Sequence, residues 1–117
     1  MIEPLNIDAQ DAQGRKASIT ISMLSNDSVE LSVTDAGSDN LYTLTGVTSD
    51  GPGVAHGTTS VWGQHPAIHL AIMPDAFHIS VDHMWFAPSP MVFKSDAATL
   101  AKAKAWLTAA AFPYASA

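Results

Sequence analysis

Histidine is the residue type in this sequence best suited to chemistry, because neutral imidazole binds transition metals and its charge changes near neutral pH. All five histidines fall within one stretch of 28 positions, and these are His56, His65, His69, His78 and His83. Their spacing matches no compact metal-binding signature. The chain has no cysteine, which excludes disulfides and any cysteine-ligated zinc or iron–sulfur site. What the histidines can do therefore depends on which of them the fold brings together.

A predicted hairpin brings two of the histidines to one face of a sheet. Apolar runs at residues 67–73 and 76–86 are separated by Pro74 and Asp75. A two-residue turn there determines the register, and it pairs Ile72 with Phe77, Leu70 with Ile79, and Ile68 with Val81. The opposite face then carries His69 across from Ser80, with His78 and Asp82 as diagonal neighbours.

Two imidazoles and one carboxylate can bind a divalent transition metal such as zinc. His69, His78 and Asp82 are therefore the candidate metal ligands. A polar sheet face is more often solvated or covered by a partner, so our first expectation is that the protein has no cofactor, and the metal is the alternative.

The same face suggests a serine hydrolase, because it holds Ser80 beside His69 and Asp82. Nucleophilic catalysis also needs an exposed, activated hydroxyl and an oxyanion hole. A serine in the middle of a strand provides neither, so we predict no catalytic residue. The glycine-rich stretch at residues 48–57 lacks the lysine of a phosphate-binding loop, and we interpret it as a flexible connection.

A candidate binding surface consists of Trp62, His65 and His56, which lie within or close after the glycine-rich stretch. Tryptophan is enriched at binding hot spots, although burial of Trp62 in the core is an equal alternative. His83 and Trp85 are predicted on the apolar face of the second hairpin, as core residues.

Alternation with a period of two predicts strands at residues 19–23, 29–33, 41–47, 67–73 and 76–86, and Leu5 and Ile7 suggest one more at the edge. After Ser95 or Asp96, leucines and alanines recur at helical spacing until Pro113. We therefore predict one α+β domain over residues 1–117. It has an antiparallel sheet of about five to six strands, built from a meander and hairpins, with one C-terminal α-helix packed on a face.

Charge restricts the class of partner. The net charge is −6, and positions 17–93 contain neither lysine nor arginine. Nucleic acids and anionic membranes both require clustered cations, so we expect neither as a partner. The acidic N-terminal sequence does not fit a secretory signal, and we expect a cytoplasmic protein.

Two functional hypotheses remain. The first is a small, acidic, non-enzymatic protein-interaction module, such as an adaptor, an inhibitor or an immunity-like protein. Its partner would be a protein with a basic surface, and it could also form a homodimer through its sheet. The second is a metal-binding or small-ligand-binding protein that uses the histidine-rich face, with or without hydrolytic activity.

Overall fold

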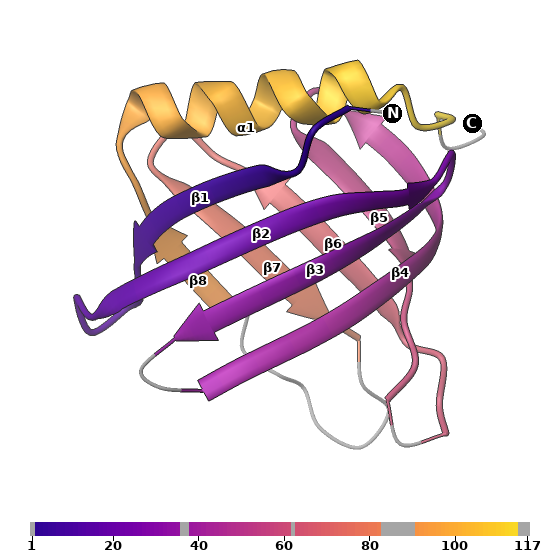
Figure 1. The fold of residues 1–117 in the computed structure, drawn as a ribbon, viewed down its shortest axis with the longest axis horizontal. Helices are drawn as coiled ribbons and strands as arrows, with labels where there is room; N and C mark the ends of the chain where they lie inside the picture. The colour runs from indigo at the N-terminus through magenta and orange to yellow at the C-terminus, as the bar shows by residue number, and fades with distance from the viewer. Residues whose placement is uncertain (1, 36–37, 62, 83–90, 115–117) are drawn as a thin grey trace.

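The computed structural model describes residues 2–35, 38–61, 63–82 and 91–114, which form a ring of eight antiparallel strands followed by one helix (Figure 1). Each strand pairs with the next one along the chain, and β8 returns to β1. The elements are β1 (Leu5–Gln10), β2 (Lys16–Ser25), β3 (Ser28–Asp35), β4 (Ser38–Gly51), β5 (Val54–Thr58), β6 (Ala67–Ile72), β7 (Ala76–Val81), β8 (Met91–Lys94) and α1 (Ala97–Ala110).

Alternating side chains explain why β2 and β3 form one wall of the barrel. Ile19 pairs with Val33 and Ile21 with Leu31, and all four are buried. The residues between them, such as Thr20, lie on the outer side of the wall. The predicted meander of β2, β3 and β4 is confirmed.

The hairpin of β6 and β7 has the predicted register. Ile72 pairs with Phe77 and Leu70 with Ile79, and the amide of Met73 donates to the carbonyl of Ala76 at 2.8 Å. The large apolar side chains of these pairs are buried inside the barrel. His69 consequently lies across from Ser80 on the outer surface.

The predicted number of strands is wrong, because the sheet has eight strands and closes on itself. The glycine-rich stretch is not a flexible connection but the end of β4 followed by β5. Gly57 lies within β5. The residue here is glycine because an added Cβ would lie 3.1 Å from the carbonyl oxygen of Thr45. Close approach of two backbones thus accounts for this glycine within a strand. The strand predicted at residues 76–86 ends at Val81, and residues 83–86 lie outside the described residues.

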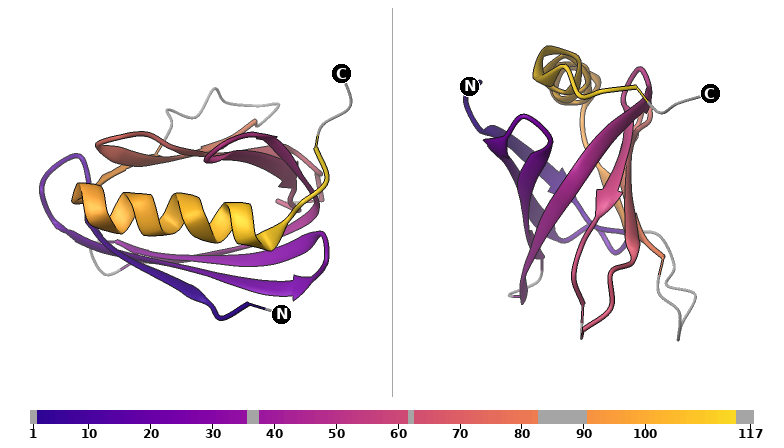
Figure 2. Two further views of the ribbon diagram at one scale, coloured as in Figure 1. Left: turned by 90° about the horizontal axis from the view of Figure 1, so that it is seen from above. Right: turned by 90° about the vertical axis from the view of Figure 1, so that its right-hand side faces the viewer.

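The C-terminal helix is confirmed, and it lies across one end of the barrel (Figure 2). Leu100, Ala103 and Leu107 are buried there and join the core enclosed by the strands. Among the described residues, no helix has the length and apolar character needed to span a membrane.

The side chain of Asp96 caps this helix, since its Oδ1 accepts the amide of Thr99 at 2.7 Å. We expect Asp96→Ala to lower the thermal midpoint by roughly 3–6 °C, because the amide loses its partner. Asp96→Asn keeps an acceptor oxygen and should lower the thermal midpoint much less. Circular dichroism melts of both variants check this, and equal losses would contradict a capping role.

The inside of the barrel is filled by side chains. Its largest members are at most 1% exposed, and they are Phe77, Ile7, Ile19, Ile21, Leu31, Leu44, Ile68, Leu70, Ile79, Val29, Val33 and Val47. Their packing leaves the outer wall and the ends of the barrel as the places to look for a site.

Candidate functional site

Two histidines lie side by side on the outer wall. His56 of β5 pairs directly with His69 of β6, and the centres of their rings are 5.7 Å apart. The inward neighbours of His56 and His69, Ala55 and Leu70, are buried, which directs both imidazoles outward by the alternation of a strand.

Each ring is hydrogen-bonded to a carboxylate. Asp50 Oδ2 lies 2.6 Å from His56 Nδ1, and Asp82 Oδ2 lies 3.0 Å from His69 Nε2. Asp50 belongs to β4, in a β-bulge between Ser49 and Gly51. Such a bulge redirects a side chain. Four side chains from β4, β5, β6 and the end of β7 therefore form one line, which we call the histidine row: Asp50, His56, His69 and Asp82.

The histidine row overlaps only in part with the predicted metal ligands. His69 and Asp82 are in contact, as their predicted proximity suggested, whereas His78 pairs with Ala71, two positions further along the hairpin. Within the described ranges, no three histidine, aspartate or glutamate side chains are grouped to hold a metal ion. The three-ligand set of His69, His78 and Asp82 stays a prediction.

The predicted binding surface is divided by the structure. His56 belongs to the histidine row, whereas His65 is exposed in the connection between β5 and β6. Trp62 lies outside the described residues, as do His83 and Trp85. Sequence reasoning missed the pairing of His56 with His69 and the contribution of Asp50.

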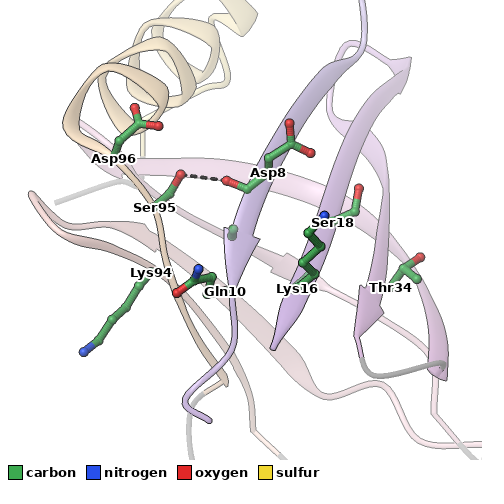
Figure 3. Close-up of a pocket in the computed structure, with 10 residues that line it drawn as sticks. Asp8, Gln10, Lys16, Ser18, Thr34, Lys94, Ser95 and Asp96 are labelled. Carbon is green, nitrogen blue, oxygen red and sulfur yellow. Dashed lines mark hydrogen bonds between the residues drawn. The ribbon is translucent and has the colours of Figure 1, made fainter. Parts of the chain in front are cut away.

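The second candidate site is the seam, which we define as the junction between β1 and β8. Among the described residues, β1 pairs with β2 at six positions, but with β8 only where Gln10 meets Lys94. Beside this junction lies an open surface groove of about 800 Å³ (Figure 3). It is lined by polar side chains from three neighbouring strands and by the residues that lead into α1, including Asp8, Ser18, Thr34, Ser95 and Asp96.

The backbone of β1 is partly free at the seam. The hydroxyl of Ser95 donates to the carbonyl oxygen of Asp8 at 2.7 Å (Figure 3), so this carbonyl is directed away from β2. Backbone groups of residues two apart on a strand point to the same side. The N–H and C=O of Asn6 therefore also face the seam, where β1 and β8 share no further pair.

No family model, curated protein or solved structure matches this chain.

A pair of aspartates joins the turn between β1 and β2, which holds Asp11, to the end of β3, which holds Asp35. Asp11, 5% exposed, accepts the amides of Gln13 and Arg15 and the Nε of Arg15 at 2.8–2.9 Å. Burial opposes its ionisation, but hydrogen bonds from Arg15, Asp35 and Gln13 outweigh burial and lower the pKa of Asp11 to about 2. The hydrogen bond with Asp11, together with burial and the charge of Asp11, raises the pKa of Asp35.

The opposite shifts predict the pH dependence of stability. The pKa of Asp35 is higher in the native state than in the unfolded state, so protonated Asp35 stabilises the native state. This stabilisation is lost as pH rises through the raised pKa of Asp35. The contribution of Asp11 has the opposite sign and is lost as pH falls from about 4 towards 2. We expect Asp35→Asn, which keeps a donor for Asp11, to become increasingly stable relative to wild type as pH rises from 3 to 7. Thermal melts across this range test it. A difference in thermal midpoint between the variant and wild type that stays constant with pH would contradict the raised pKa of Asp35.

Proposed function

We propose that this protein is a small, non-enzymatic interaction module that binds an extended segment of a protein partner along the free edge of β1. The observation that carries the proposal is the incomplete pairing at the seam, where β1 meets β8 at a single position. The filled interior of the barrel supports it as well, because it places recognition on the outer surface.

Strand addition fits the geometry of this edge. An extended peptide that joins a sheet edge gains main-chain hydrogen bonds, and its alternate side chains reach the surface beside the edge. The backbone groups of Asn6 face the seam, and the groove, which is lined from Asp8 onward, offers polar side chains to the incoming segment. Edge strands are ordinarily protected against such pairing by charges, proline or a covering element. β1 has no proline and carries one charge, that of Asp8, between the exposed Asn6 and Gln10.

Charge favours a basic segment. Asp8 and Asp96 both line the groove, and the protein as a whole carries a net charge of −6. Lys16 and Lys94 also line it, but the side chain of Lys94 points away from Asp8 (Figure 3). Opposite charges across a strand pair are stabilising, so lysine or arginine opposite Asp8 would add to the main-chain bonds. Association should slow as the salt concentration rises.

The test uses a short peptide that alternates lysine and threonine, with a glutamate-for-lysine peptide as its control. We expect the basic peptide to shift the NMR amide signals of β1 and β8, and the acidic peptide to have little effect. Shifts confined to other strands, or equal shifts with both peptides, would contradict the proposal.

Two substitutions at Asn6 separate main-chain recognition from side-chain recognition. Both remove the amide that accepts the Thr20 hydroxyl at 3.0 Å, but only Asn6→Pro removes the backbone N–H at the seam. We expect Asn6→Pro to reduce peptide binding at least 10-fold and Asn6→Ala to retain most of it. Sedimentation of both variants shows whether a second copy of the chain uses the same edge. Equal binding by the two variants would argue against strand addition.

A further inference from the structure

We propose that His56 and His69 together bind one divalent transition-metal ion on the outer surface of β5 and β6. This site is separate from the seam, which lies between β1 and β8, and it does not depend on the proposed interaction function. It also differs from the set predicted from sequence, because His56 takes the place of His78.

The two carboxylates of the histidine row determine which ring nitrogens are free to bind a metal. A carboxylate accepts a hydrogen bond from a ring N–H, which leaves the lone pair on the other nitrogen of a neutral imidazole. Asp50 bonds to Nδ1 of His56, so Nε2 keeps the lone pair. Asp82 bonds to Nε2 of His69, so Nδ1 keeps it.

The free nitrogens lie on the sides of the rings away from their carboxylates. In the ring of strands, β5 and β6 are neighbours between β4 and β7. Asp50 approaches His56 from β4, and Asp82 approaches His69 from the end of β7. The two carboxylates therefore reach the pair of rings from the strands that flank it.

The separation of the rings suits a shared ion. Zinc binds imidazole nitrogen at about 2.0–2.1 Å, so two rings on one tetrahedral zinc have centres roughly 5–6 Å apart. The centres of His56 and His69 are 5.7 Å apart in the structure. The side chains of His56 and His69 are 35% and 45% exposed, so small rotations can bring Nε2 of His56 and Nδ1 of His69 to one ion.

The surroundings favour a cation. Positions 17–93, which include all four residues of the row, contain no lysine or arginine, and Asp50 and Asp82 place two carboxylates at the ends of the row. A carboxylate bonded to a metal-binding histidine orients the ring and raises its basicity. The chain supplies two ligands, so solvent or a further ligand completes the coordination, and Cu²⁺ should bind more tightly than Zn²⁺ or Ni²⁺.

The test is calorimetric titration of the full chain with zinc chloride and with copper(II) chloride at neutral pH. We expect one equivalent to bind, and His56→Ala and His69→Ala each to weaken binding at least 10-fold. The EPR spectrum of the copper complex should show two equatorial nitrogen ligands. His65→Ala and His78→Ala serve as controls that should bind as wild type does.

Asp50→Asn tests the orienting carboxylate separately. We expect it to weaken zinc binding roughly 10-fold while circular dichroism stays unchanged. The proposal is overturned if both histidine variants bind like wild type, or if His78→Ala abolishes binding, which would instead favour the set of His69, His78 and Asp82. A copper spectrum with one nitrogen ligand would also overturn it.

Discussion

Phe77→Ala is expected to lower the free energy of unfolding by about 3–5 kcal/mol, which is the usual cost of removing a buried phenylalanine ring. Phe77 is a core phenylalanine with no exposed surface. It pairs with Ile72 on one side and with Phe93 on the other. Because interior side chains pack at crystal-like density, the surrounding residues can only partly fill the space that the ring leaves. Urea denaturation with an unchanged m-value measures the loss.

Leu41→Ala provides the control for this loss. Leu41 is also apolar and lies in a strand, but its side chain is 64% exposed on the outer wall. Its replacement should change the free energy of unfolding by no more than about 0.5 kcal/mol. If Phe77→Ala cost as little as Leu41→Ala, the interior would not be packed, and the case for placing recognition on the outer surface would fail.

Gly57→Val is expected to lower the free energy of unfolding by about 1–3 kcal/mol. An added Cβ at this position would lie 3.1 Å from the carbonyl oxygen of Thr45, and 3.3 Å from side-chain atoms of Leu44 and Val47. The nearest of these atoms belongs to the backbone of the adjoining strand, so relief requires β4 and β5 to move apart. The thermal midpoint and the urea midpoint should both fall.

Ala71→Val is the matched control for Gly57→Val. It adds apolar bulk to β6, the strand next to β5, at a position that pairs with His78 and is only partly buried. We expect little change in stability, because valine suits a strand and its side chain has room at the surface. Gly57→Ala should lie between the two. Equal stability of Gly57→Val and wild type would show that β4 and β5 are not closely packed there.

The histidine row could be predicted only in part from the sequence. The contact of His69 with Asp82 followed from the hairpin, because a turn of Pro74 and Asp75 allows only one register for β6 and β7. His56 was not connected to His69, because residues 59–66 separate β5 from β6 and no short turn determines their register. Asp50 was missed because it reaches His56 through a bulge, which the local pattern of residues 48–57 does not reveal.

The seam was also beyond sequence reasoning. Gln10 and Lys94 are joined only when the sheet curls until its first and last strands meet. Strand twist and the packing of the interior cause that closure. Neither can be inferred from a short stretch of sequence. An open sheet and a closed barrel have the same alternation, so the predicted five to six strands and the observed eight differ in number and in closure.

The sequence by itself determined the features that depend on neighbours along the chain. These are the inward and outward faces of the predicted strands, the register of the β6–β7 hairpin, the start of the helix after Ser95 or Asp96 and the long stretch without lysine or arginine. Only the tertiary structure decided the ring closure, the partial pairing at the seam and the meeting of His56 with His69. The physical reason is range: side-chain alternation, tight turns and helix caps act over a few residues. Closure depends instead on packing between strands that are distant in sequence.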